Sequence, residues 1–163
     1  MSRRDSKIVC VLAVAFYGVL ATLTNIIDYK VNFSAVAATM TMKDIFAGSS
    51  LGIRAINYPL FHHLAFIFII FCEGLGAVVT LMGTFKLIKN RSNDALIFNQ
   101  EKNWAIAGLT ITFLTWQVLF MTIAGEWFGI WMASTSLAGT VRNAFQIFMM
   151  ALGVLIYLNM DDK

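Results

Sequence analysis

The sequence has few of the residues that interrupt or cross-link a chain. It contains one proline in 163 residues, two cysteines and two histidines, and only 13% of its residues are charged. A chain with one proline can form long uninterrupted helices. Cys10 and Cys72 both lie inside apolar runs, so they indicate neither a disulfide framework nor a cysteine metal site. The scarcity of these residues excludes a disulfide-rich secreted fold.

The motifs of soluble enzymes are also missing. No nucleophile stands beside a base, and neither a glycine-rich phosphate loop nor a metal-binding pattern occurs. We therefore expect a protein that is not an enzyme, with no catalytic residue, no metal site and no required cofactor. The net charge of +3 does not call for a nucleic-acid partner, because the basic residues gather at the ends of apolar segments.

Apolar residues, in contrast, are abundant and occur in long runs. They make up 59% of the chain, which is typical of an integral membrane protein, and about 20 consecutive apolar residues suffice to cross a bilayer as a helix. The sequence predicts an all-α integral membrane protein, a single domain over 1–163 whose four transmembrane helices form an antiparallel bundle. The expected spans are 8–27, 60–85, 103–123 and 141–158, with a long outer loop at 28–58 and a cytoplasmic loop at 86–102.

The first apolar run follows a basic start and so has two features of a signal peptide. It continues to Ile27, however, beyond the usual core of about 7 to 15 residues, and no small-residue cleavage pattern follows it. We interpret it as a retained membrane helix. Gly18, Thr22 and Asn25 fall on one of its faces, a small and polar stripe that favours close helix packing.

The first outer loop is too polar to span the membrane and too long for a tight turn. Within it, Phe33, Val36, Ala37 and Met40 share one side of a possible short helix, which we expect to lie at the membrane interface. Pro59 follows the loop and suits the first turn of the second membrane helix.

The distribution of basic residues predicts the orientation in the membrane. Cytoplasmic segments of membrane proteins carry an excess of lysine and arginine. On this rule both termini are cytoplasmic. We also expect membrane lipids to surround the helices. The cytoplasmic group is Arg3, Arg4, Lys7, Lys86, Lys89, Arg91, Lys102 and Lys163, and the smaller outer group is Lys30, Lys43, Arg54 and Arg142.

Glu73 lies near the middle of the second apolar run, and with His62 and His63 it forms the predicted intramembrane polar site. An acidic residue at the centre of a span costs about 2.5 to 3.5 kcal/mol, so it should face protein or water and have a partner. His62 lies about three turns earlier on the same face, at about 3.6 residues per turn. Glu73 could carry protons or cations, or it could be a protonated carboxyl hydrogen-bonded between helices.

The two histidines raise the possibility of haem. Adjacent residues on a helix point about 100° apart, so His62 and His63 cannot both reach one metal ion comfortably. No other histidine exists in the chain, and haem held by two histidines would need a second chain. We favour a structural or interfacial role for both, with haem as the alternative.

Polar side chains near the outer ends of the expected helices form a predicted outer polar cluster. Within it we expect Glu126 and Arg142 to form an ion pair that fastens the last outer connection, and Trp127 and Trp131 to settle at the membrane interface. On the third helix, Gly108, Thr112, Thr115, Leu119 and Thr122 make a packing face. The members of the outer polar cluster are Asn25, Asp28, Arg54, Glu126, Arg142, Asn143 and Gln146.

Several short motifs in a fixed order resemble the bacterial family of predicted small integral membrane proteins known as domain-of-unknown-function family 2165. The motifs are NIIDYKVNF at 25–33, RAINYPLFHH at 54–63, Glu73, Trp116 and GEWF at 125–128. The resemblance covers essentially the whole chain and implies four spans in the bacterial cytoplasmic membrane. It implies no activity, cofactor or catalytic residue.

The fourth segment departs from the pattern of that family. Members read Trp-Asn-Gly-Gln and then Ala-Phe-Arg, where this sequence has Leu137 to Thr140 and then Ala144 to Gln146. The nearest arginine here is Arg142. Any role of the family's arginine is therefore lost here or moved by about one helical turn.

Three classes of function fit these observations. The first, which we favour, is a non-catalytic accessory or interaction subunit of a larger membrane complex or a homo-oligomer, because packing stripes are present and a catalytic constellation is not. The second is a small proton-coupled transporter or channel that uses Glu73. The third is a haem- or quinone-associated subunit that uses His62 or His63.

Overall fold

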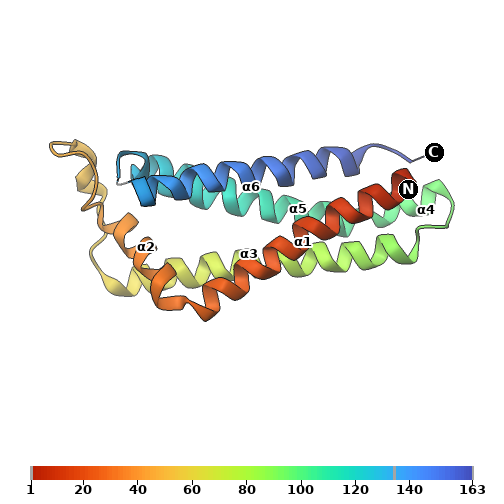
Figure 1. Cartoon of the computed structure of the whole chain (residues 1–163), viewed down its shortest axis with the longest axis horizontal. Coiled ribbons are helices and arrows are strands. Elements are labelled where there is room, and N and C mark those ends of the chain that lie inside the picture. Colours follow the sequence, from red (N-terminus) through yellow and green to blue (C-terminus); the bar gives the residue numbers. More distant parts are fainter. Residues whose placement is uncertain (1, 134, 163) are drawn as a thin grey trace.

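The structure is a computed structural model that describes residues 2–133 and 135–162. These residues form helices and their connections, with no strand among them. Four helical stretches are long and apolar enough to cross a membrane: Arg3–Ile27, Pro59–Lys89, Ala95–Trp127 and Ser136–Asn159. The predicted all-α fold with four membrane-spanning helices is confirmed (Figure 1).

Shorter helical elements join and complete these spans. A helix lies within the region of the first long loop, and the third span consists of three consecutive helical pieces. In chain order the elements are α1 (Arg3–Ile27), α2 (Tyr29–Thr41), η1 (Ser50–Arg54), α3 (Pro59–Lys89), α4 (Ala95–Glu101), α5 (Asn103–Leu114), η2 (Thr115–Trp127), η3 (Ile130–Met132) and α6 (Thr135–Asn159).

Local capping explains where several helices begin. The Ser2 hydroxyl accepts a hydrogen bond from the Asp5 backbone N–H, and the Asp5 carboxylate accepts one from the Ser2 backbone, both at 3.1 Å. This capping box starts α1 several residues before the predicted span. Pro59 occupies the first turn of α3, as predicted.

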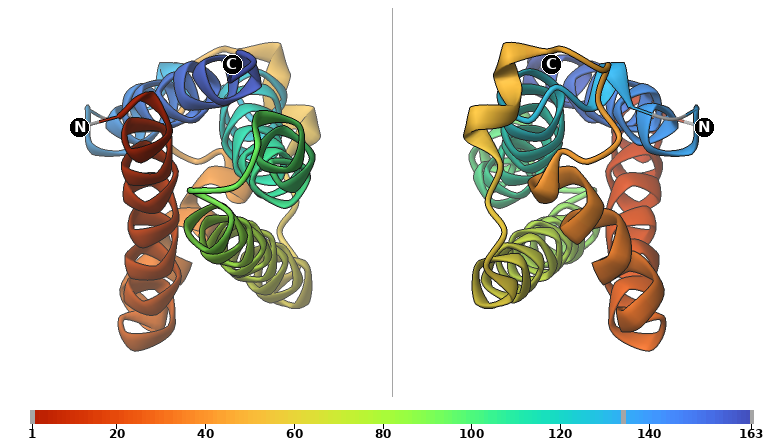
Figure 2. Two further views of the ribbon diagram at one scale, coloured as in Figure 1. Left: turned by 90° about the vertical axis from the view of Figure 1, so that its right-hand side faces the viewer. Right: turned by 90° about the vertical axis from the view of Figure 1, so that its left-hand side faces the viewer.

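The helices form a ring in which α3 packs on α1 and α5, while α6 packs on α5, η2 and α1 (Figure 2). Residues 2 and 162 lie at the same end of the bundle, which we call the terminal end (Figure 1). The opposite end, covered by α2 and residues 42–58, is the loop end. In Figure 1, α1 and α3 diverge from α5 and α6 toward the loop end.

Small residues allow the close contacts of α3 with its neighbours. A Cβ atom added at Gly83 would overlap the backbone of Ala105 on α5, and one at Gly18 would lie 3.1 Å from Ala77 Cβ. The predicted stripe on α1 that contains Gly18 therefore packs against α3. Such backbone proximity strengthens dispersion contacts between membrane helices, for which no hydrophobic driving force exists in lipid.

The apolar core is concentrated at the terminal end. There, buried side chains from α1, α3, α4, α5 and α6 form one cluster, whereas a smaller cluster lies beneath the loop end, around Met40, Met42 and Phe128. The region between the two clusters is less tightly filled, and it contains the candidate site. The terminal cluster consists of Ile8, Val11, Val14, Leu87, Phe98, Ala105, Leu109, Ala151 and Leu158.

The loop end is held together by α2 and the chain that follows it. α2 begins at Tyr29, earlier than the expected short helix, and ends where Met42 adopts a left-handed conformation with φ of 51°. The Ile56 backbone N–H donates to the Met40 carbonyl at 2.8 Å, which brings the approach to α3 back onto α2. α2 thereby covers one side of the bundle near α3.

Candidate functional site

Glu73 lies in the middle of α3, and its side chain is 5% exposed. Asn25 on α1 donates from Nδ2 to Glu73 Oε2 at 2.7 Å. Glu73 Oε1 is buried and has no hydrogen-bond partner in the structure. The partner expected for an acidic residue at this depth is thus an amide, and only one of the two carboxyl oxygens is satisfied.

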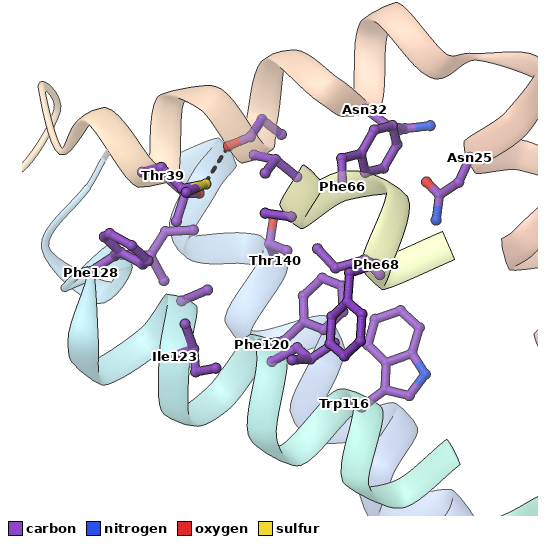
Figure 3. A pocket seen from close by; sticks show the side chains of 18 of the residues that line it. Asn25, Asn32, Thr39, Phe66, Phe68, Trp116, Phe120, Ile123, Phe128 and Thr140 are labelled. Carbon is purple, nitrogen blue, oxygen red and sulfur yellow. Dashed lines mark hydrogen bonds between the residues drawn. The ribbon is translucent and has the colours of Figure 1, made fainter. Parts of the chain in front are cut away.

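Beside Glu73 is a cavity of about 740 Å³, which lies between α1, α2, α3, η2, η3 and α6 (Figure 3). Its wall is mostly apolar, with a few polar side chains that include Asn32, Thr39 and Thr140. Figure 3 shows Asn25 and Asn32 on the side of α1 and α2, and Trp116 and Phe120 on the opposite side. The lining residues are Tyr17, Asn25, Asn32, Ala35, Val36, Thr39, Met40, Ile56, Ala65, Phe66, Phe68, Ile69, Glu73, Trp116, Leu119, Phe120, Ile123, Ala124, Trp127, Phe128, Ile130, Thr140, Asn143 and Ile147.

Aromatic rings from two helices form part of the wall. The rings of Trp116 and Phe120 are stacked with centroids 4.4 Å apart, and the ring of Tyr17 is 6.3 Å from that of Trp116. Tyr17 was not among the predicted site residues. One signal could have found it: Asn25 lies about two helical turns after Tyr17 on the same face of α1.

The third span changes its helical form where it begins to line the cavity. From Thr115 to Trp127 it is π-helical. The Phe128 backbone N–H accordingly donates to the Ile123 carbonyl, five residues earlier, at 3.0 Å. π-Helical turns are rare and occur frequently at functional sites. This segment supplies the cavity residues Trp116, Leu119, Phe120, Ile123, Ala124 and Trp127.

Neither His62 nor His63, the residues grouped with Glu73 in the predicted intramembrane polar site, lines the cavity. His62 is buried on the predicted face, but its Nε2 donates to the Ile56 carbonyl at 2.7 Å. His63 is exposed, shares a hydrogen bond of 2.9 Å with the Tyr29 hydroxyl and stacks on Phe33 at 4.0 Å. Both imidazoles therefore hold the loop end to α3, because both have partners in the segments around α2.

The ion pair expected between Glu126 and Arg142 is absent, and both side chains are exposed. α6 begins at Thr135 rather than at Val141, so Arg142 lies in the body of the helix and away from the last connection. Arg54 contacts that connection instead: its Nη1 donates to the Glu126 carbonyl at 3.5 Å.

The remaining members of the outer polar cluster are dispersed. Asp28 and Gln146 are exposed, Asn25 binds Glu73, and Asn143 reaches the cavity wall. The structure therefore does not bring the predicted cluster together as one site. It assigns two of its asparagines, Asn25 and Asn143, to the cavity.

The interfacial tryptophans lie near the loop end, and both are about half exposed. The Arg54 guanidinium lies 4.8 Å from the ring centroid of Trp127 and donates to the Trp127 carbonyl at 3.2 Å. Trp131 contacts Phe46 edge to face, with centroids 6.1 Å apart. Their exposure agrees with the amphipathic rings that gather at membrane interfaces.

Residues 3–161 match the family described as Predicted small integral membrane protein (DUF2165). No curated protein and no solved structure is significantly similar to the chain. The match extends over nearly the whole sequence, from the start of α1 to beyond the end of α6. With its four apolar helices, the chain belongs to this family of small integral membrane proteins of unknown function.

Proposed function

We propose that this protein is a non-catalytic membrane module that binds a lipophilic small molecule in the cavity beside Glu73. The observation that carries the proposal is the unpartnered Oε1 of a buried glutamate at a cavity of about 740 Å³. Ligand pockets typically measure about 300 to 1,000 Å³ and combine apolar walls with a few polar groups. The volume and the wall of this cavity fit that description.

A buried polar atom without a partner costs free energy, so a native structure that retains one needs a reason for it. A bound molecule that hydrogen-bonds Glu73 Oε1 would supply the missing partner. The π-helical wall from Thr115 to Trp127 supports the same proposal, because such turns are frequent at functional sites.

The packing favours binding over a continuous channel. The apolar core at the terminal end, with Leu87, Leu109 and Leu158 almost fully buried, lies between the cavity and that end of the bundle. A transporter that uses Glu73 would need a second conformation in which this core opens. Binding needs only the conformation that the structure shows.

We further propose that the terminal end faces the cytoplasm of a bacterial cell, with the protein in its cytoplasmic membrane. The excess of lysine and arginine at that end supports this orientation. The cavity would then lie in the outer half of the membrane, beneath α2.

Photolabelling in lipid nanodiscs tests the proposed function. A neutral alkyl diazirine should label residues of η2 and α3 at the cavity in a saturable way, whereas labelling of lipid-facing residues should rise linearly with the probe. Ala124→Phe places a large side chain in the cavity wall and should abolish the saturable part. Ala107→Phe is the matched control on an exposed position of α5, and it should leave labelling unchanged. Linear labelling alone in the parent would refute the proposal.

A second candidate function is the accessory or interaction subunit expected from the sequence, and an exposed face of α6 favours it. Gln146 is exposed near the middle of α6, and Cβ atoms added at Gly139 and Gly153, about two turns to either side, would meet no atom within 4 Å. A polar side chain at this depth is stabilised by a hydrogen bond to another helix. Gln146→Leu should therefore release a bound partner or copy, as measured by native mass spectrometry, whereas Met149→Leu on the same face should not.

A further inference from the structure

We propose that the ligand of this cavity is a lipophilic monocation, a protonated amine whose ammonium group pairs with Glu73. This inference rests on the proposed function, because it names the chemical class of the molecule that the cavity holds. Three properties of the wall support it: its charge, its hydrogen-bonding groups and its aromatic rings.

The charge of the wall excludes anions. Among the described residues that line the cavity, Glu73 is the one carboxylic acid, and lysine, arginine and histidine do not occur. A carboxylate in a site of low polarity repels an anionic ligand and is itself stabilised by a nearby cation. A monocation would give the occupied site a net charge of zero, whereas a dication would leave one buried charge without a partner.

The hydrogen-bonding groups at Glu73 favour a ligand that donates hydrogen bonds. Asn25 donates from Nδ2 to Glu73 Oε2, which leaves the buried Glu73 Oε1 as an acceptor without a donor. An ammonium group carries up to three N–H donors and no acceptor, so it can supply the donor that Glu73 Oε1 lacks. Hydrogen bonds between charged groups are roughly twice as strong as those between neutral ones.

The aromatic part of the wall suits both the ammonium group and the apolar body of such a ligand. The faces of Trp116, Phe120 and Tyr17 can attract a positive charge through their ring quadrupoles, and tryptophan is the most effective residue for this contact. Phe66 and Phe68 extend the apolar surface on α3. The cavity of about 740 Å³ thus has room for an aromatic or aliphatic body attached to the ammonium.

Three dansyl probes with the same five-carbon chain, which end in an ammonium, a hydroxyl or a carboxylate, test the proposal. Each competes with the neutral diazirine in nanodiscs that contain the full chain. The ammonium probe should displace the diazirine at a concentration about tenfold or more below that of the hydroxyl probe, the size expected for a hydrogen bond to a charged group. The carboxylate probe should be the weakest of the three.

Glu73→Gln should remove the preference for the ammonium probe while the hydroxyl probe still binds. Glu101→Gln is the matched control, since it removes a carboxylate that pairs with Lys86 outside the cavity. That control should keep the preference, and the comparison cancels differences in how the probes partition into lipid. Trp116→Leu gives an independent test, because it should weaken the binding of the ammonium probe more than the binding of the hydroxyl probe.

The outcomes separate the two proposals. If no probe displaces the diazirine in a saturable way, the proposed function fails. If the three probes bind equally, or if Glu73→Gln and Trp116→Leu both keep the preference of the parent, the cavity binds lipophilic molecules but the monocation proposal is wrong. Loss of the preference in Glu73→Gln, with retained binding of the hydroxyl probe, supports both proposals.

Discussion

The Lys7 ammonium lies 2.7 Å from the Asp162 carboxylate, and neither side chain is more than 4% exposed. Lys102 Nζ is also 2.7 Å from the same carboxylate oxygen, Asp162 Oδ2. Both lysines donate to the Met160 carbonyl as well, and Asn99 donates to the Asp162 carbonyl at 3.1 Å. This buried group joins α1, the junction of α4 and α5, and the end of the chain, which closes the terminal end of the bundle.

We predict that Asp162→Asn destabilises the protein strongly. The substitution leaves two buried ammonium groups without an anion, which typically costs about 3 to 5 kcal/mol. The unfolding free energy in SDS titrations should fall by about that amount. Asp161→Asn, a change to the neighbouring exposed carboxylate, is the control and should alter stability by less than about 0.5 kcal/mol. Equal stability of the two variants would show that the buried group does not close the bundle.

We predict that the buried ion pairs of Asp162 with Lys7 and Lys102 make the stability of the protein depend on pH in the acidic range. Burial raises the pKa of Asp162, but hydrogen bonds and charges from Lys102 and Lys7 outweigh it, so the pKa lies below its ordinary value of 3.8. A carboxyl with a lowered folded-state pKa contributes stability above its unfolded pKa, and this contribution is lost as the pH falls through the folded value. The melting temperature should therefore fall below about pH 4. The fall should be smaller in Asp162→Asn, and an identical pH profile for variant and parent would contradict the assignment.

We predict that Asn25 and Glu73 are coupled. Asn25→Leu leaves a buried carboxyl with no partner and should cost about 1 to 3 kcal/mol of unfolding free energy. The double variant Asn25→Leu/Glu73→Leu removes both polar groups. Its unfolding free energy should be closer to that of the parent than the value for Asn25→Leu alone, because replacing both partners with apolar groups can be nearly neutral. A double-mutant cycle in SDS unfolding measures this coupling. Strictly additive effects would mean that the hydrogen bond makes no contribution.

We predict that Gly83 is required for the contact between α3 and α5. Gly83→Ala forces a methyl group into the Ala105 backbone and should destabilise the bundle by about 1 to 3 kcal/mol. Gly153→Ala is the matched control, because its Cβ would meet no atom within 4 Å. The control should leave stability unchanged or raise it slightly, since alanine favours a helix more than glycine does. A stable Gly83→Ala variant would show that the two helices are not in close backbone contact.

We predict that the loop end and the turn between α3 and α4 face opposite sides of the membrane. After removal of Cys10 and Cys72, an impermeant thiol reagent should label a cysteine at Ser49 in intact cells. A cysteine at Ser92 should be labelled only after the cells are opened. Labelling of both positions from outside would contradict the four-span arrangement, in which α3 (Pro59–Lys89) crosses the membrane between them.

The amino-acid sequence by itself determined the architecture of this protein. Hydropathy and helical periodicity are local properties, and they suffice to predict four spans, the start of α3 at Pro59 and the packing face of α1 that includes Gly18. They also placed Glu73 at the centre of a span, where an acidic residue requires a protein partner. These features follow from the cost of polar groups in a bilayer, and that cost depends on each segment alone.

The tertiary structure alone decided which polar groups meet. Asn25 pairs with Glu73 rather than with the loop end, Lys7 reaches Asp162 across 155 positions, and Glu126 does not pair with Arg142. Each of these outcomes depends on how far the helices are rotated and splayed relative to one another, which no single segment encodes. The cavity beside Glu73 has the same origin, because it exists where α1 and α3 diverge from η2 and α6.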